Sequence, residues 1–382
     1  RDRSVSRGLG DVYKRQTMNV GWAYFSECIE LNHAAVNPAF SLMSSMSKGE
    51  DFSNQYRFMT SAEADAAFAP LAQRPVVFPD DEGSWLSTRR PNIVLVILES
   101  FTGHILDMPD VMPRLKALSE EGIYFPHFYA NSFRTDRGLV SILSGYPAQP
   151  TASIMKYPSK SQSLPAIARS LRKAGYDTEM IYGGDADFTN MRSYFYATGY
   201  GRVMSCDDFT TEENSARWGV PDHITFSRVE KEIARQTVRP FMKTFLTLSS
   251  HEPFDVPMCR LEHPYLNSVA YTDSCLGAFV DTLRQSPLWN DLLIVFVADH
   301  TMRYPAGIQE YEVKRHHIPM IWCGGAVRGH RVVEDYASQI DLAATLLAQM
   351  HIDYSDFTFS KNIADTTQRH FAYYTYKDGL GY

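Results

Sequence analysis

Cysteine is scarce in this chain, which has five cysteines in 382 residues, all far apart and none in a CxxC pair. This spacing argues against a zinc ribbon and a dense disulfide framework. The sequence also lacks a run of about 20 apolar residues, the length that a membrane-spanning helix needs, and a secretory signal peptide. Acidic residues outnumber basic ones, 44 against 37, and this balance argues against a general nucleic-acid binder.

The sequence divides into three expected regions. Residues 1–16 (RDRSVSRGLGDVYKRQ) show no hydrophobic periodicity, and their end resembles a translated sequencing adapter, so we exclude them from the fold. We expect residues 17–90 to be a helical arm and linker that follows a missing membrane region. Residues 91–382 are expected to form the main domain, with a truncated C-terminus because the last expected strand lies so close to the end.

Two apolar runs organise the main domain. Residues 93–98 and 292–298 are rich in β-branched side chains, which is typical of strands buried on both faces of a parallel sheet. Helical and strand patterns alternate around them and predict an α/β fold, a three-layer α/β/α sandwich with a mostly parallel central sheet. The other expected strands are 123–128, 178–182, 241–248, 318–323 and 371–376, and the expected helices are 112–121, 136–143, 163–174, 224–236, 268–284 and 341–350.

Polar residues follow both runs directly. Glu99 ends the first, and Asp299 and His300 end the second, where open α/β sheets bind ligands. Thr135 precedes an expected helix, whose N-terminus favours negative charge. Each residue has an ordinary alternative, as a strand-end carboxylate, a turn or a helix cap. Together they predict a mostly oxygen site for Mn²⁺, Mg²⁺ or Zn²⁺, with a hydroxyl that the ion would activate toward a phosphoryl or sulfuryl group.

Several motifs then carry a family resemblance. The segments IVLVILES, NSFRTDRG, SSHEPF, VADH and SQIDLAATLL resemble the sulfatase-like branch of the alkaline phosphatase superfamily, and NPAFSLMSSM resembles the linker of its lipoteichoic acid synthase family. Members of that family are membrane-anchored phosphoglycerol transferases. The resemblance implies a sulfatase-like catalytic domain over residues 91–382. Sulfatases need CxPxR or SxPxR, which is absent, so sulfate-ester hydrolysis is not expected.

The resemblance also implies roles for individual residues. By position, Glu99, Thr135, Asp299 and His300 match a single Mn²⁺ site with Thr135 as nucleophile. His251 and Arg192 match the residues that contact the substrate headgroup. The family has a tryptophan two positions before that arginine, where this chain has Asn190, so the headgroup pocket is expected to differ in shape.

Further basic side chains near these motifs have open roles. Arg134 and Arg137 flank Thr135 and could hold phosphate oxygens, although Arg137 is more simply a solvated residue. His316 and His317 could contact the substrate or leaving group, or could merely open a strand.

These observations predict a phosphoglycerol transferase that depends on one divalent metal, Mn²⁺ being favoured over Mg²⁺ or Zn²⁺. It would act on a glycerophospholipid resembling phosphatidylglycerol through a covalent phospho-threonine and would pass the group to a glycan or polyol acceptor. The expected location is the cell membrane, with the catalytic domain outside the cytoplasm, in the periplasm or at the cell surface. The alternatives are a phosphoethanolamine transferase, a phosphodiesterase, and a non-catalytic binder of an anionic glycan or lipid.

Overall fold

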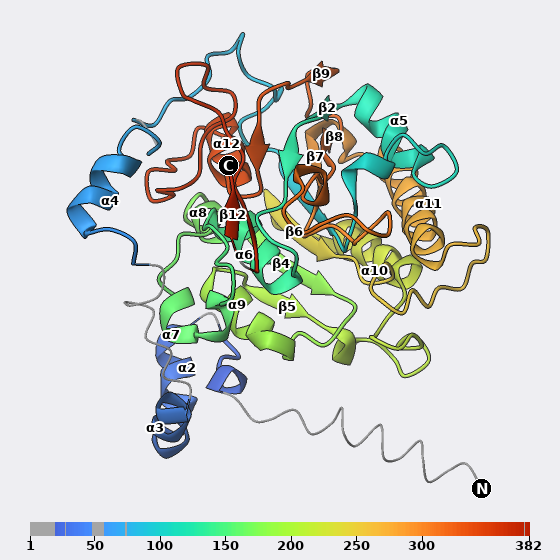
Figure 1. Ribbon diagram of the computed structural model, residues 1–382. Helices are drawn as coiled ribbons and strands as arrows, with labels where there is room; N and C mark the ends of the chain where they lie inside the picture. Colours follow the sequence, from blue (N-terminus) through green and yellow to red (C-terminus); the bar gives the residue numbers. More distant parts are fainter. Residues whose placement is uncertain (1–19, 27, 48–56, 73–74, 378) are drawn as a thin grey trace, which may run out of the picture.

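The computed structural model describes residues 20–26, 28–47, 57–72, 75–377 and 379–382. The expected adapter, residues 1–16, lies outside the described residues. The central sheet contains β1 (Asn92–Leu98), β2 (Ile123–Tyr124), β4 (Asp177–Tyr182), β5 (Arg202–Met204), β6 (Phe241–Leu246), β7 (Leu292–Ala298), β8 (Met320–Cys323) and β9 (Arg331–Val332). These strands run in the order β5–β4–β6–β1–β7–β8–β2–β9 (Figure 1). The first five are parallel to their neighbours, whereas β8 is antiparallel to both β7 and β2.

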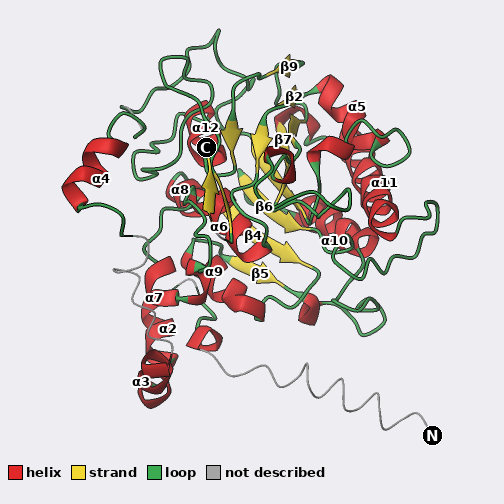
Figure 2. Ribbon diagram, viewed as in Figure 1, coloured by secondary structure: helices red, strands yellow, loops and turns green. Residues whose placement is uncertain are grey.

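Helices cover both faces of this sheet (Figure 2). One layer consists of α5 (Pro113–Glu121), α10 (Asp222–Arg235) and α11 (Pro264–Arg284), in which α11 packs against both of the others. The opposite layer contains α6 (Thr135–Ser144), α8 (Ile167–Lys173) and α12 (Asp341–Gln349), in which α6 contacts both of the others. The expected three-layer α/β/α sandwich is therefore confirmed.

Shorter elements connect these layers. They include α7 (Pro158–Ser161), α9 (Met191–Ala197), and two small sheets, β3 (Phe128–Tyr129) with β10 (Ala337–Ser338) and β11 (Tyr374–Tyr376) with β12 (Gly379–Gly381). Single 3₁₀ turns are η2 (Gly103–Ile105), η3 (Ile154–Lys156), η4 (Phe188–Asn190), η5 (Cys206–Asp208), η6 (Trp289–Asp291) and η7 (Val313–Arg315).

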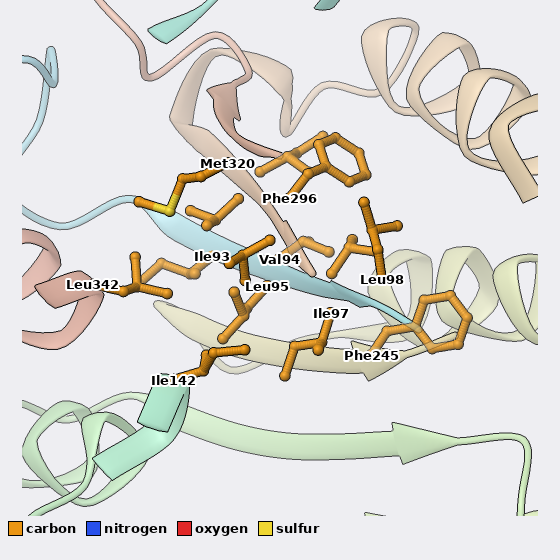
Figure 3. Close-up of a cluster of buried hydrophobic side chains, with 14 of the residues drawn as sticks. Ile93, Val94, Leu95, Ile97, Leu98, Ile142, Phe245, Phe296, Met320 and Leu342 are labelled. Atoms are coloured by element: carbon orange, nitrogen blue, oxygen red, sulfur yellow. The ribbon is translucent and has the colours of Figure 1, made fainter. Parts of the chain in front are cut away.

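Strand β1 lies at the centre of the core. All seven of its residues are buried, as are all seven of β7. Figure 3 shows Leu95 and Ile97 on the side of Ile142 of α6, because alternate residues of a strand point to opposite faces. Burying each aliphatic side chain fully contributes about 1.5–3 kcal/mol. The continuous apolar runs in the sequence therefore reflect helices packed on both faces of the sheet.

One expected strand, 123–128, is divided in the structure. Its first part is β2, which pairs with β8 in the main sheet, and its end begins β3, which pairs with β10 in a separate sheet. Pro126 lies between the two parts. Proline has no N–H to donate to a strand partner, so the chain leaves one sheet there before it joins the other.

The described residues of the N-terminal segment up to Phe68 contain several short helices. These are η1 (Val20–Ala23), α2 (Ile29–Ala35), α3 (Pro38–Ser47) and α4 (Ser61–Phe68), and η1 contacts α9. The segment then lies on the main domain, where the backbone N–H of Trp85 donates to Gln349 Oε1 (2.7 Å). A search of the described helices for length and apolar character found none suited to crossing a membrane. All five cysteines carry free thiols.

Candidate active site

Four side chains meet at the C-terminal edge of β1 and β7. The Thr135 hydroxyl lies 3.2 Å from Glu99 Oε2 and 3.3 Å from His300 Nε2. His300 Nε2 is in turn 3.4 Å from Glu99 Oε1 and 3.5 Å from Asp299 Oδ2. The ligand atoms of the two carboxylates and the imidazole all lie within 4.8 Å of one another. The structure thus brings together the four residues that the sequence selected as metal ligands.

Strand register places the two carboxylates together. In the parallel pair β1–β7, Leu98 is the partner of Ala298, and the backbone N–H of Asp299 donates to Leu98 O (3.2 Å). The next residue of each strand, Glu99 and Asp299, therefore leaves the sheet at the same edge. Two buried carboxyl groups are thus brought to one point by the pairing of two fully buried strands.

The turn after β1 fixes the orientation of Glu99. Its backbone N–H donates to Thr247 Oγ1 (2.9 Å), and its carbonyl accepts from Ser250 Oγ (2.6 Å). Ser100 has a φ of 59°, a strained conformation for a residue other than glycine. Its hydroxyl donates to Glu99 Oε1 (2.7 Å) and its N–H to Asp299 Oδ1 (2.9 Å). Ser100 therefore connects both carboxylates.

Thr135 is the first residue of α6, and the N-cap position belongs to Arg134. The capping alternative for Thr135 is therefore wrong. Its hydroxyl points to the cluster, next to the unpaired N–H groups and positive dipole end of a buried helix, which stabilise negative charge there.

Gln339 holds the loop before α6 and the Asp299 turn together, although it was not among the residues predicted for the site. Its amide nitrogen donates to Ala298 O (2.7 Å) and Asp299 O (2.6 Å), and its amide oxygen accepts from the backbone N–H of Asn131 (2.9 Å). The side chain is fully buried. The only signal in the sequence was its place in the SQIDLAATLL motif.

The electrostatics of the cluster follow from its burial. Burial and the adjacent charge of Glu99 raise the pKa of Asp299. Burial would lower the pKa of His300, but the two carboxylates raise it. Burial likewise opposes ionisation of Glu99, yet the contact with His300 and the charge of His251 hold its pKa below the ordinary value. The cluster without a cation therefore retains protons that a divalent cation would displace.

The donor set fits a divalent cation. Asp299 Oδ2 is buried and accepts no hydrogen bond among the described residues, which is costly for a carboxylate unless a cation neutralises it. His300 Nδ1–H donates to Thr301 O (3.1 Å), so the lone pair of a neutral imidazole lies on Nε2, which faces the carboxylates. Three oxygen ligands and one nitrogen suit Mn²⁺, Mg²⁺ or Zn²⁺.

The two expected headgroup residues occupy different environments. His251 lies in the loop after β6 and is near enough to influence the pKa of Glu99. Arg192 is the second residue of α9 and makes a two-point contact with Asp187, through Nε (2.9 Å) and an NH2 group (3.3 Å). Its NH2 group also donates to Ser205 Oγ (3.0 Å). Acidic and hydroxyl neighbours thus fix Arg192, and its contact with a substrate stays a prediction.

Arg134 and His317 also have protein partners. Arg134 is half-exposed and lies 3.5 Å from Asp136. His317 Nε2–H donates to Pro126 O (2.8 Å), and burial lowers its pKa, which favours a structural role. Their substrate contacts remain untested predictions.

The other two basic residues considered in the sequence, Arg137 and His316, also contact protein groups. Arg137 is buried in α6 and donates to Pro150 O (2.8 Å), so it is not the solvated residue that was expected. His316 donates to Glu310 O (2.8 Å) and stacks on Tyr374.

A comparison with protein families matches residues 91–352 to the family described as Sulfatase. The chain belongs to the sulfatase family. The matched residues include β1, α6 and β7, so all four clustered residues lie within this sulfatase-family domain. The predicted sulfatase-like membership of the alkaline phosphatase superfamily is confirmed, and with it the prediction of an enzyme.

Individual proteins similar to this chain belong to the same superfamily or carry related names. This sulfatase-family chain is 26% identical over 304 residues to lipoteichoic acid synthase 2 of Bacillus subtilis (strain 168), covering 70% of the chain and 46% of the relative. It is 24% identical to phosphoglycerol transferase I of Xanthomonas campestris pv. campestris (strain B100), covering 68% and 40%. The chain thus spans less than half the length of these relatives. A solved alkaline phosphatase superfamily protein from Vibrio parahaemolyticus superposes with a TM-score of 0.73 at 26% identity, covering 85% of the chain and 84% of that protein.

Proposed function

We propose that this chain is the catalytic domain of a metal-dependent phosphoglycerol transferase whose donor is a glycerophospholipid resembling phosphatidylglycerol. One observation carries the proposal: the Thr135 hydroxyl lies at a helix N-terminus within 3.3 Å of both Glu99 and His300. A pure binding protein has no need of a hydroxyl at that place. The names of the relatives, a lipoteichoic acid synthase and a phosphoglycerol transferase, support the choice of substrate.

Glu99, Thr135, Asp299 and His300 would hold one divalent ion, with Mn²⁺ favoured. When bound, the ion would lower the pKa of the hydroxyl and polarise a phosphoryl oxygen. Thr135 Oγ1 attacks the phosphorus of the donor, its bond to phosphorus forms, and the bond to the diacylglycerol oxygen breaks. The hydroxyl proton leaves Thr135, and diacylglycerol departs with a proton on that oxygen.

A hydroxyl of a glycan or polyol then attacks the phosphoglycerol–Thr135 intermediate. Its oxygen forms the new bond to phosphorus, its proton is released, and Thr135 regains a proton as its own bond to phosphorus breaks. The N-terminus of α6 stabilises negative charge on the attacked phosphoryl group. Three side chains would contact the headgroup, those of His251, Arg192 and Arg134. His317 is the weakest of the four candidates, because its Nε2–H already donates a hydrogen bond to the carbonyl oxygen of Pro126.

Such a donor lies in a membrane. The proposed location is therefore the cell membrane, with this domain outside the cytoplasm, in the periplasm or at the cell surface.

The test is a headgroup comparison. The purified chain is incubated with Mn²⁺ and vesicles that contain fluorescent phosphatidylglycerol, and diacylglycerol is measured. We expect diacylglycerol release and a glycerophosphate adduct, detected by mass spectrometry, on the peptide that contains Thr135. Phosphatidylethanolamine in identical vesicles is the matched control.

The alternatives give different products. Preference for phosphatidylethanolamine would indicate a phosphoethanolamine transferase, and free glycerophosphate without transfer to added glycerol would indicate a phosphodiesterase. Metal binding with neither product nor adduct would contradict the proposal.

A further inference from the structure

The short stretch from Trp218 to Asp222, the first residue of α10, holds the His251 loop at both of its ends. At the start of the loop, the Asp222 carboxylate accepts the backbone N–H groups of Leu248 (2.8 Å) and Ser249 (3.2 Å). At the other end, the indole N–H of Trp218 donates to Glu252 O (2.7 Å). Trp218 and Asp222 are four residues apart, and Asp222 is fully buried. The loop is therefore held from one side by a single local element.

The Glu252 carbonyl receives a second donor, the imidazole of His251, whose Nδ1 lies 2.8 Å away. A carbonyl oxygen can only accept, so the proton of a neutral His251 must lie on Nδ1. Its lone pair is then on Nε2.

The space around the imidazole is restricted. The rings of Trp218 and His251 are 4.9 Å apart and tilted by 60°. Both line a cavity of about 20 Å³, which has room for about one water molecule. Trp218 therefore contacts the imidazole as well as the carbonyl that fixes its tautomer.

We propose that Trp218 is a positioning residue for the transfer reaction, fixing the orientation and tautomer of His251 through the Glu252 carbonyl. The inference rests on the proposed function in assigning His251 to the headgroup. Ser250, the residue before His251, also donates to the Glu99 carbonyl (2.6 Å), so the held loop is tied directly to the metal cluster. Trp218 thereby presents Nε2 as an acceptor for a hydroxyl of the phosphoglycerol group or of the incoming alcohol.

Two variants separate the hydrogen bond from the ring contact. Trp218→Phe removes the indole N–H but keeps an aromatic ring beside His251, whereas Trp218→Ala removes both. We expect Trp218→Phe to lower kcat/KM for phosphatidylglycerol about three- to tenfold, the range for loss of one hydrogen bond. Trp289→Phe is the matched control, because Trp289 begins η6 just before β7, at the opposite end of that strand from Asp299.

A double-mutant cycle tests whether Trp218 acts through His251. In the His251→Ala background, Trp218→Phe should cause no further loss of kcat/KM. An equal loss in both backgrounds would overturn the proposal, because a general structural effect does not need the imidazole. Thermal unfolding of each variant checks that the fold is kept.

A second measurement needs no activity. Long-range ¹H–¹⁵N spectra of the Mg²⁺-loaded chain at pH 8, with ¹⁵N-labelled histidine and His251→Ala for assignment, report the tautomer. We expect His251 of the unmodified chain to be in the Nδ1–H form. Trp218→Phe should convert it to a mixture of the two tautomers, and Trp289→Phe should leave it unchanged. An Nε2–H form in the unmodified chain, or no response to Trp218→Phe, would contradict the inference. If phosphatidylglycerol is not a substrate, the proposed function fails, but these spectra still decide the role of Trp218.

Discussion

A β-carbon on Gly138 would lie 2.0 Å from the carbonyl oxygen of Asp299. Helix α6, which begins with Thr135, therefore contacts the end of β7 backbone to backbone. Only glycine permits this approach, and with it the 3.3 Å distance between Thr135 Oγ1 and His300 Nε2. The glycine of the NSFRTDRG motif thus sets the spacing between Thr135 and the Asp299–His300 turn.

Gly138→Ala should therefore displace the helix from the Asp299 turn. We expect a loss of about 1–3 kcal/mol in the free energy of unfolding, typical of overpacking, together with weaker Mn²⁺ binding. Denaturant unfolding and metal titration measure the two effects. Gly83→Ala is the control, because its new β-carbon would meet only side-chain atoms of Asp80 and Pro79. Unchanged metal affinity in Gly138→Ala would show that the spacing is not critical.

Thr135→Ala should abolish the covalent route while leaving three of the four ligands and the helix in place. We expect diacylglycerol release to fall by about 10³-fold or more, since a water molecule is a poorly placed substitute, and the adduct to disappear. Thr135→Ser keeps a hydroxyl at the same position and should retain part of the activity. Turnover by Thr135→Ala as fast as that of the unmodified chain would reduce Thr135 to a structural residue.

Metal affinity should rise with pH. Without a cation the pKa of Asp299 is raised to about 8 and that of His300 to about 9, so both groups carry protons at neutral pH. A divalent ion must displace these protons, so Mn²⁺ binding is weakest at low pH and strengthens as pH rises through these values. Calorimetry between pH 6 and 9 should show up to about a tenfold gain in affinity per pH unit for each proton released. An affinity independent of pH would contradict the proposed ligands.

The same protons affect the stability of the metal-free protein. Because folding raises both pKa values, their contribution to the free energy of unfolding is fully present below the unfolded-state values. It is lost as pH rises through about 8 to 9. Unfolding in a chelator should therefore show lower stability at pH 9 than at pH 7, and adding Mn²⁺ at pH 9 should restore it.

Gln339→Leu should separate two loops that the sequence places 168 residues apart, those of Asn131 and Asp299. The change leaves the Asn131 N–H without its partner and removes the donor to two carbonyls, at a cost of about 1–3 kcal/mol for each group that becomes buried and unpaired. We expect lower thermal stability and reduced turnover. Gln309→Leu, at an exposed position, is the matched control and should change neither.

The sequence determined the central strands and the identity of the four clustered residues. Continuous β-branched apolar runs such as 93–98 and 292–298 are typical of strands covered on both faces, and a polar residue directly after such a strand lies at the sheet edge. That physical constraint is local, so a single sequence carries it. The helix that follows the nucleophile was likewise visible, although it begins at Thr135 and not one residue later.

Only the tertiary structure decided which side chains support the site. The division of 123–128 between two sheets depends on partners in β8 and β10, and the burial of Arg137 depends on the carbonyl of Pro150. Gln339 and Trp218 act through hydrogen bonds to backbone carbonyls far away in the chain, at Asp299 and Glu252. Every residue has such a carbonyl, so the sequence has no pattern that marks the acceptor. The partner is chosen when the strands and helices pack.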